Sequence, residues 1–414
     1  MSLATGNNAS LSGRTQPIRP KFIPEWSIGD QRIHLPKWYL PVFFVIIVGS
    51  LALPHGKARV YTTLPMVLGL MSMLPYYTEG SFKKDFDLGN LVFGWFLMYL
   101  ALILTSPEKQ FWKEDGRKLT ADERFKELES KSFLQKLVWS FGVWTNPRGI
   151  GWSHKVPGLR SAPAGYPVWK FVLQKLGYTL AFSVILDGLN LWYKHLQTTS
   201  PDANWTVFSE PIPIRTLIGL SNLLRIYSEM ALMHSLTAAV TTALRIYNPS
   251  DWPAIVGRLS DAYTVKRFWG MVWHQFMRQI AHSGGLLLSR DLFALPKGSF
   301  LGRLLYLVGG FASPGLYHTM VAVFATGFRA GWNPCGDLEC FVMQAIAILV
   351  EGWAIDVVKR TGHGGNTTGW RVFGYLWCAC WLGYSQLRYV DGLRQAGLWD
   401  VELRVLGYLP GVSL

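Results

Sequence analysis

The sequence predicts an all-α fold, a polytopic bundle of about eight or nine helices embedded in a membrane. Half of the 414 residues are hydrophobic and only 16% are charged, whereas soluble domains carry roughly 25% charged residues. The apolar residues also come in long blocks, and about 20 such residues at about 1.5 Å each cross a bilayer. The net charge of +14 arises mainly from Lys and Arg between these blocks. That pattern is typical of topology signals and headgroup contacts, and it does not indicate nucleic-acid binding.

The polar segments divide the chain. Residues 1–37 are basic and interrupted by prolines, so we expect a disordered arm. A membrane-bound domain is predicted over 38–395, followed by a C-terminal tail over 396–414. Within the domain, the polar stretch 107–169 predicts a cytosolic insert that begins with an amphipathic helix and continues as a Gly- and Pro-rich surface loop. The aromatic, amphipathic stretch 247–299 is expected at the cytosolic interface.

The apolar blocks give the expected membrane spans. One block is too long for a single perpendicular span and contains Arg225, Glu229 and His234. We therefore expect that block to be tilted or broken, with its polar groups facing the interior of the bundle. The expected spans, in chain order, are Trp38–Leu53, Val60–Tyr77, Leu88–Ser106, Lys170–Tyr193, Ile214–Ile246, Phe300–Phe328, Leu338–Val358 and Trp370–Val390.

Two further patterns concern the cellular compartment. Asn204-Trp205-Thr206 matches a glycosylation acceptor, which places its loop in the lumen and agrees with a cytosolic insert. The sequence thus predicts a multi-pass glycoprotein, and we expect it in the endoplasmic reticulum. Cys335 and Cys340 flank a short polar loop and could form a disulfide or remain free. No His or Cys cluster has metal-ligand spacing, so no metal is predicted.

The span Phe300–Phe328 carries one ionisable side chain, His318, between Arg303 and Arg329. Ionisable groups at that depth are costly and usually face a partner, a cavity or the bundle interior. Ser313-Pro314-Gly315 precedes the histidine by one turn, and its proline predicts a broken or kinked helix there. A general base inside a membrane would have this form. A histidine that simply bonds a neighbouring carbonyl would also fit the pattern.

The stretch 251–278 contains a second group of candidate residues. On an α-helix, Trp269 and Trp273 share one face, while Gly270 and His274 share the next. Such a surface could cover an apolar substrate, with His274 and Arg278 reaching a polar group beyond it. An interfacial aromatic belt would give the same tryptophans for solvation reasons alone.

These residues resemble known motifs. Phe268-Trp269-Gly270 with Trp273-His274 resembles the FWG-x-x-W-[HN] signature of the wax synthase-like branch of the membrane-bound O-acyltransferase superfamily. Phe311 to His318 resembles its F-x-x-SGL-x-H motif, from which this sequence departs at Pro314, and Thr319 replaces the Glu that often follows the histidine in plant members. Arg148-Gly149-Ile150-Gly151-Trp152 resembles the RGIGW element of fungal members, and the similarity covers roughly residues 40 to 390.

The resemblance implies an acyl-CoA-dependent O-acyltransferase. His318 would be the general base that takes a hydroxyl proton, and His274 would orient the donor or stabilise the oxyanion. Phe268, Trp269, Trp273, Ser313 and Gly315 are the candidate substrate contacts. Arg267, Arg278 and Arg148 are the candidates for binding the anionic coenzyme A head, although such residues also serve as interface anchors.

The fungal resemblance favours acetyl transfer from acetyl-CoA to a hydroxylated, membrane-soluble natural product such as a terpenoid. A long-chain wax ester synthase is the alternative within the family. A transporter, a membrane terpene cyclase or prenyltransferase, and a non-catalytic scaffold are the alternatives outside it. The sequence disfavours a transporter because it contains no internal repeat, and it disfavours a cyclase because its spans lack paired Asp motifs, apart from Glu351 and Asp356. Those two residues are five apart and not on one helical face, so we interpret them as polar contacts within the bundle or as an effect of the helix end. A scaffold would tolerate replacement of the histidines.

Overall fold

The computed structural model describes residues 32–199, 205–273, 275–362, 367–399 and 405–406. Nearly all regular structure in them is helical, which confirms the predicted all-α fold. The α-helices are α1 (Tyr39–Ala52), α2 (Lys57–Met73), α3 (Phe82–Thr105), α4 (Ala121–Ser130), α5 (Phe133–Thr145), α6 (Val168–Thr199), α7 (Ile212–Ala243), α8 (Val265–Arg267), α9 (Arg278–Leu286), α10 (Phe300–Ala325), α11 (Asp337–Arg360), α12 (Thr368–Ser385) and α13 (Leu387–Gln395). Two π-helices, η7 (Phe268–Val272) and η8 (Leu287–Leu292), flank α9. The short 3-10 turns are η2 (Leu74–Tyr76), η3 (Pro107–Lys109), η4 (Val207–Ser209), η5 (Pro249–Asp251) and η6 (Leu259–Asp261).

The strands are minimal. β1 (Ile33–His34) pairs in parallel with β2 (Tyr77–Thr78). Beside this pair, Arg32 forms an ion pair with Asp85 at 3.1 Å. The described end of the predicted N-terminal arm, residues 32–37, is therefore held against α3. Residues 1–31 lie outside the described part of the chain, so the expected disorder of the arm stays a prediction.

Four helices in the described residues, α3, α6, α10 and α11, are long and apolar enough to cross a membrane. The shorter α1 is also apolar. The helix bounds follow the expected spans closely, but the predicted number of eight or nine spans is not confirmed. The long block at Ile214–Ile246 forms one unbroken helix, α7. Arg225 is buried on it and pairs with Glu229 at 3.2 Å, in agreement with the inward placement expected for these polar groups.

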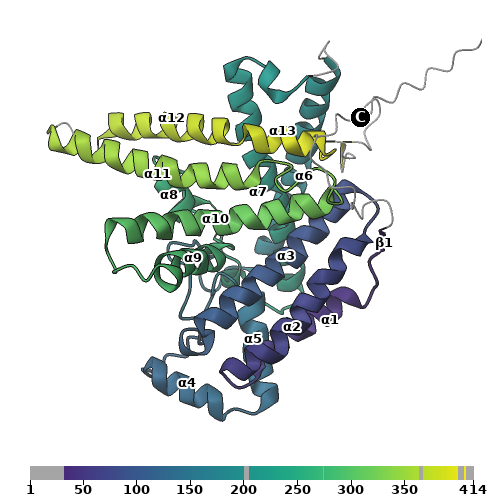
Figure 1. Cartoon of the computed structure of the whole chain (residues 1–414), viewed down its shortest axis with the longest axis vertical. Helices are drawn as coiled ribbons and strands as arrows, with labels where there is room; N and C mark the ends of the chain where they lie inside the picture. The colour runs from purple at the N-terminus through teal and green to yellow at the C-terminus, as the bar shows by residue number, and fades with distance from the viewer. Residues whose placement is uncertain (1–31, 200–204, 274, 363–366, 400–404, 407–414) are drawn as a thin grey trace, which may run out of the picture.

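α10 is central in the bundle (Figure 1). It packs extensively against α3, α9 and α11, and α6 packs along α7. In Figure 1, α10, α11 and α12 run side by side, while α1, α2, α3 and α5 form a second group below them. Tyr317 ties the two groups together, because its hydroxyl donates to the backbone and side-chain oxygens of Asn90 at 2.9 and 2.8 Å.

The helix α10 continues through Pro314, so the expected break is wrong. Pro314 removes the N–H that would bond the carbonyl of Gly310, but it does not remove the neighbouring bonds of the helix. The helices α9 and α11 also pack against α10 on either side of this point. Packing from two sides stabilises a proline-containing helix in a membrane bundle.

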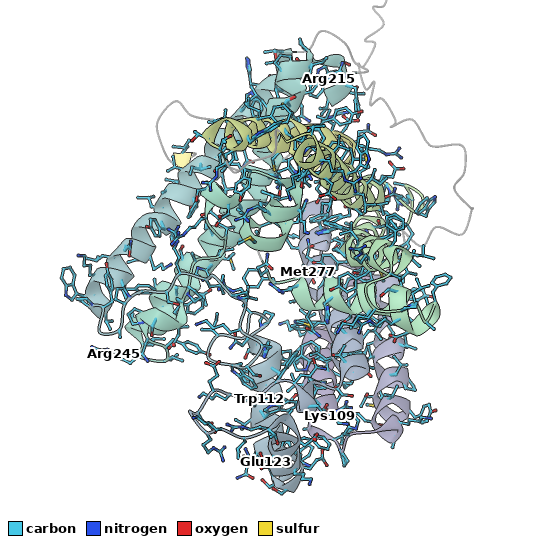
Figure 2. The ribbon with its side chains drawn as sticks, turned by 90° about the vertical axis from the view of Figure 1, so that its left-hand side faces the viewer. Lys109, Trp112, Glu123, Arg215, Arg245 and Met277 are labelled. Atoms are coloured by element: carbon cyan, nitrogen blue, oxygen red, sulfur yellow. The ribbon has the colours of Figure 1, made fainter. Side chains whose placement is uncertain are left out.

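The charged insert begins with the predicted amphipathic helix, α4. Thr120 and Glu123 form a capping box, in which each side chain bonds the backbone N–H of the other residue. Ser132 and Gln135 form a second box that starts α5, a helix that the sequence analysis did not expect. In Figure 2, Glu123 of α4 lies at one end of the molecule and Arg215 of α7 at the other.

Candidate active site

One face of α10 borders a pocket of about 430 Å³. Tyr306, Gly310, Pro314 and His318 line it at intervals of four residues, the spacing of one helical face. Met277, which Figure 2 labels near the middle of the view, borders the same pocket. The other lining residues are Leu223, Ile226, Lys266, Trp269, Gly270, Trp273, Gln275, Arg278, Ala281, His282, Leu307, Phe311, Cys340, Phe341, Ile348, Gln386 and Tyr389.

The imidazole of His318 is held among aromatic rings. It stacks on Phe341 of α11, with ring centroids 5.1 Å apart and an interplanar angle of 13°. Tyr317 meets it edge-on at 4.6 Å, and Tyr389 of α13 lies 6.4 Å away. Three helices therefore fix the ring while one side of it borders the pocket. This is the arrangement expected of a positioned base beside an apolar substrate.

The aromatic motif contributes another part of the pocket wall. Trp269 and Trp273 line the pocket with their rings 6.1 Å apart, and Phe268 packs behind both. The segment is a π-helix, not the expected α-helix, because the N–H of Trp273 bonds the carbonyl of Phe268 at 2.7 Å. Trp273 itself has extended backbone angles and ends the helix. The α-helical face assumed for these tryptophans is therefore wrong, although both indoles border the same space.

Two buried polar residues of α11 fix this wall. The Gln344 Oε1 accepts from the Trp269 indole at 3.2 Å and from the Trp381 indole at 3.0 Å. Glu351 accepts from the backbone N–H of Val265 at 2.7 Å and from the Trp377 indole at 3.1 Å. The two residues are seven apart, which places them on one side of α11 two turns apart.

The sequence analysis named Glu351 only as a polar contact within the bundle and did not name Gln344. The sequence did contain a signal for both residues, because Gln344 and Glu351 are two polar residues spaced seven apart in an apolar helix. Their partners lie 75 and 86 residues away, so the sequence alone did not connect them to the pocket.

The other candidate residues occupy different places. Ser313 faces α9, where its hydroxyl donates to the Ile280 carbonyl at 3.4 Å, and Gly315 packs on α11 against Leu338. Neither lines the pocket, so their role as substrate contacts stays a prediction. Arg267 pairs with Asp261 at 2.8 Å, stacks over Tyr263 and also lies outside the pocket. Of the three candidate arginines, Arg278 alone lines it. His274 and Asn204 lie outside the described residues.

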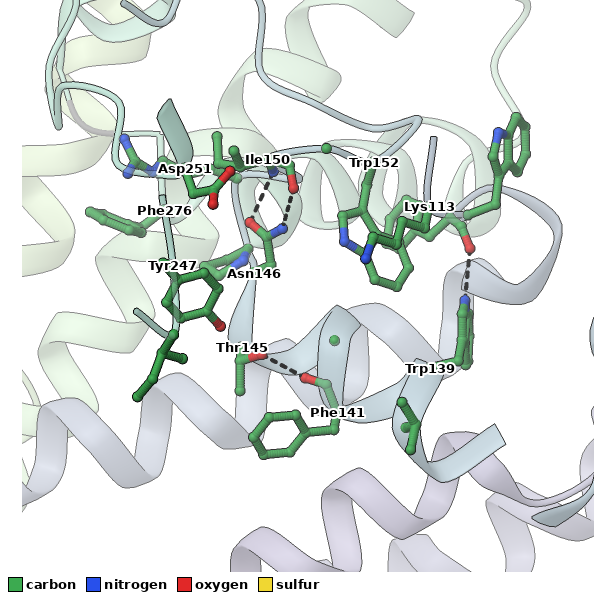
Figure 3. A pocket seen from close by; sticks show the side chains of 18 of the residues that line it. Lys113, Trp139, Phe141, Thr145, Asn146, Ile150, Trp152, Tyr247, Asp251 and Phe276 are labelled. Carbon is green, nitrogen blue, oxygen red and sulfur yellow. Dashed lines mark hydrogen bonds between the residues drawn. The ribbon is translucent and has the colours of Figure 1, made fainter. Parts of the chain in front are cut away.

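Arg148 borders a second, larger cavity of about 1550 Å³ between the insert and α7, called the outer cavity below (Figure 3). Its guanidinium is buried, bonds the Ala254 carbonyl at 2.8 Å and lies over the ring of Phe276. Burial lowers the pKa of Arg148 to about 10, which still leaves it charged at neutral pH. In Figure 3 the amide of Asn146 bridges the N–H and the carbonyl of Ile150, which closes the loop after α5.

The two glycines of the RGIGW element have a backbone role. Gly149 and Gly151 have φ angles of 62° and 75°, a region that side chains disfavour. A Cβ atom on Gly149 would also lie 2.7 Å from the ring of His154. The element is therefore a tight loop that holds Arg148 at the outer cavity.

Within the described residues, no group of three or more His, Cys, Asp or Glu side chains is arranged to hold a metal ion. The expectation of a metal-free reaction stays a prediction. The four cysteines are free thiols, so the disulfide between Cys335 and Cys340 is not formed. Cys340 instead accepts from the Gln386 amide at 3.3 Å.

Comparisons with known proteins give a consistent result. Residues 252–342 match the model of the "Membrane bound O-acyl transferase family". The chain is 27% identical to the acetyltransferase sirH of Leptosphaeria maculans, over 87% of this chain and 91% of that protein. It is 29% identical to the acetyltransferase eriL of Hericium erinaceus, over 81% and 85% of the two chains. It is 27% identical to the O-Mevalon transferase macI of Penicillium terrestre, over 84% of each. No solved structure matches the chain.

Proposed function

We propose that this acyltransferase, which is similar to the membrane-bound O-acyltransferase family over residues 252–342 and to two fungal acetyltransferases at 27% and 29% identity, acetylates a hydroxyl of a membrane-soluble natural product, such as a terpenoid. Acetyl-CoA is the donor in this proposal, His318 is the general base, and the protein acts as a multi-pass enzyme of the endoplasmic reticulum. A long-chain wax ester synthase is the alternative within the family.

One observation carries the proposal. His318 and the tryptophans Trp269 and Trp273 border one pocket, although they lie more than forty residues apart in the chain. The pocket combines a positioned imidazole with flat apolar walls. A hydrophobic alcohol can lie against the walls with its hydroxyl at the imidazole.

The reaction follows from this arrangement. The imidazole of His318 takes the hydroxyl proton as the alcohol oxygen attacks the thioester carbonyl carbon. The tetrahedral intermediate then expels the thiolate of coenzyme A, which takes the proton back from the imidazolium. One C–O bond forms, one C–S bond breaks, and no oxidant or metal is required. A free imidazole has a pKa near 6.5, which suits this exchange at neutral pH.

The names of the relatives support the choice of acyl group. The proteins from Leptosphaeria maculans and Hericium erinaceus are named acetyltransferases, which favours acetyl-CoA. The protein from Penicillium terrestre is named an O-Mevalon transferase, so a larger polar acyl group is the second donor to test. His274 stays the candidate for donor orientation or oxyanion stabilisation, and Asn204 stays the candidate glycosylation site.

The test uses microsomes that contain wild type or His318→Ala at matched levels. Radiolabelled acetyl-CoA and palmitoyl-CoA are each supplied with a panel of terpenoid and long-chain alcohols. We expect acetyl esters of a terpenoid alcohol from the wild type and none above background from the variant. His195→Ala is the control, because His195 is an exposed histidine of α6 outside both cavities, and it should retain wild-type activity.

Two results would overturn the proposal. Equal ester formation by wild type and His318→Ala would show that His318 is not the general base. Formation of palmitoyl esters of long-chain alcohols, with no acetyl transfer, would show that the protein is a wax ester synthase and not an acetyltransferase.

A further inference from the structure

The pocket has a second polar end, which the proposed reaction does not use. Arg278 and His282 of α9 and Tyr306 of α10 all line it there. The His282 Nδ1 and the Tyr306 hydroxyl lie 2.7 Å apart. We propose that this cluster binds the diphosphate of the acyl-CoA donor while the thioester lies at His318. The inference rests on the proposed function and assigns the donor a direction in the pocket.

The length of the pocket supports this assignment. Tyr306 and His318 are twelve residues apart on one face of α10, which corresponds to about 18 Å at about 1.5 Å per residue. The pantetheine arm of coenzyme A has about thirteen bonds between sulfur and the first phosphorus, or about 16 Å when extended, because each bond of about 1.5 Å advances the chain by about 1.25 Å. A donor with its thioester at His318 therefore places its phosphates beside Tyr306.

Close helix packing brings the cluster together. A Cβ atom on Gly284 of α9 would lie 2.4 Å from the Ser313 hydroxyl oxygen, and one on Gly309 of α10 would lie 2.5 Å from the Gly284 carbonyl oxygen. The two backbones approach this closely only because both positions are glycine. As a result, the side chains of α9 and α10 converge on the same end of the pocket.

The charges of the pocket favour an anion. Lys266 and Arg278 line it, and none of the described residues that line it is Asp or Glu. Among the described residues, no carboxylate lies within ion-pair distance of Arg278, whose side chain bonds only the Gln275 amide oxygen at 3.4 Å. A neutral alcohol gains nothing from these cations, whereas a diphosphate gains charge-assisted hydrogen bonds.

His282 adds a neutral donor, and the Tyr306 hydroxyl orients its ring. Partial burial, followed by the nearby Arg278 and Arg290, lowers the pKa of His282, which favours the neutral form of its ring. A neutral ring that accepts the Tyr306 proton on Nδ1 carries its own proton on Nε2, where it can donate to a phosphate oxygen. Midway along the pocket, Pro314 leaves the Gly310 carbonyl without its helical donor. That carbonyl is an acceptor for an amide N–H of the pantetheine arm.

The cluster also lies toward the hydrophilic part of the molecule. The Gln279 amide, next to Arg278, donates to the Thr105 hydroxyl at 3.4 Å, at the last residue of α3 and directly before the charged insert. A nucleotide that extends beyond the cluster therefore emerges on the side of the insert, where water solvates its remaining phosphate.

The experiment compares acetyl donors of decreasing length, which lack successive parts of coenzyme A. Initial rates are measured for wild type, Arg278→Gln and Tyr306→Phe with acetyl-CoA, S-acetyl-4′-phosphopantetheine and S-acetylpantetheine. Arg278→Gln is expected to raise KM for acetyl-CoA about tenfold, the effect of one lost charge-assisted bond. The increase should be smaller with the monophosphate donor and less than twofold with S-acetylpantetheine. Tyr384→Phe, at an exposed tyrosine of α12 outside the pocket, is the control.

Each other outcome has a clear meaning. An equal loss with all three donors would assign the cluster a structural role and overturn the proposal. A rise in KM for the alcohol alone would make it an acceptor subsite and also overturn the proposal. Binding of desulfo-CoA to purified protein separates this inference from the proposed function. If wild type makes no ester but binds desulfo-CoA about tenfold more tightly than Arg278→Gln does, the subsite stands and the assigned reaction fails.

Discussion

The two cavities of this protein lie close together and differ in how their charges are balanced. The outer cavity is lined by six carboxylates, Asp87, Glu108, Asp115, Glu127, Glu229 and Asp251, several of which pair with arginines. The pocket at His318, called the inner pocket below, has no carboxylate among the described residues that line it, and its cations Lys266 and Arg278 form no ion pair with any of them. The segment between η7 and α9 separates them, with Phe276 on the outer side and Met277 on the inner side.

This difference indicates that the outer cavity contributes mainly to stability and the pocket at His318 mainly to catalysis. Paired charges around the outer cavity neutralise each other, and one of these pairs, Arg59–Glu108, joins the insert to α2. Unpaired cations and a fixed imidazole in the inner pocket leave charge available for a substrate, which is the arrangement typical of active sites. Substitutions at the outer cavity should therefore change mainly stability, and those at the inner pocket should change mainly turnover.

The largest expected effect is on kcat, and it should differ between variants of two histidines, His318 and His234. His318 lines the inner pocket and His234 lines the outer cavity. His318→Gln keeps a polar side chain but removes the base, so kcat should fall about 10²- to 10⁴-fold. His234→Gln should change kcat by no more than about threefold. Ester formation per folded protein measures both, and a similar fall in the two variants would contradict the distinction.

The next effect concerns stability. Arg59 of α2 and Glu108 at the start of the insert form a buried ion pair and are 3% and 4% exposed. Glu108→Ala leaves the guanidinium buried without its carboxylate, a change that costs about 3–5 kcal/mol. Thermal unfolding in detergent measures the loss. The double variant Arg59→Met/Glu108→Leu should recover most of it, because it removes both charges. If the double variant is as unstable as the single one, packing and not the unpaired charge is responsible.

The sequence predicted most helices because hydropathy is a local property. α1, α10 and α11 begin and end within two or three residues of the expected spans. The position of His318 at a pocket inside the bundle could also be predicted, because a single ionisable residue in an apolar block usually faces a cavity or a partner. The π-helix η7 could not be predicted, because its sequence fits an α-helix equally well and the turn before it bonds Glu351 of the distant helix α11. The cluster at Tyr306 depends on α9 packing against α10, which local patterns do not contain.

A smaller effect tests the wall of the inner pocket. Gln344→Leu leaves the indole N–H groups of the half-buried Trp269 and Trp381 without their acceptor, at up to about 1–3 kcal/mol for each group. If the wall positions the alcohol, kcat/KM for the alcohol should fall about tenfold while KM for acetyl-CoA changes less. Trp381→Phe is the matched control, because it removes one partner of Gln344 and retains the bond to Trp269. An equal loss in both variants would show that Gln344 serves only the packing of α11 on α12.

The smallest effect is expected at the outer edge of the insert. Asp115 is paired with Arg124 and Arg117 at 2.6 Å each, and hydrogen bonds from these arginines hold its pKa well below the usual range. A carboxyl with a lowered pKa stabilises the fold fully above its unfolded value of about 3.9, and this stabilisation is lost as the pH falls through the folded value. The difference in melting temperature between wild type and Asp115→Asn should therefore be small and constant from about pH 5 to pH 8, with acyl transfer unchanged. If the difference in melting temperature vanishes near neutral pH, a group other than Asp115 causes the pH dependence. A loss of acyl transfer would show that the insert contributes to the reaction as well as to stability.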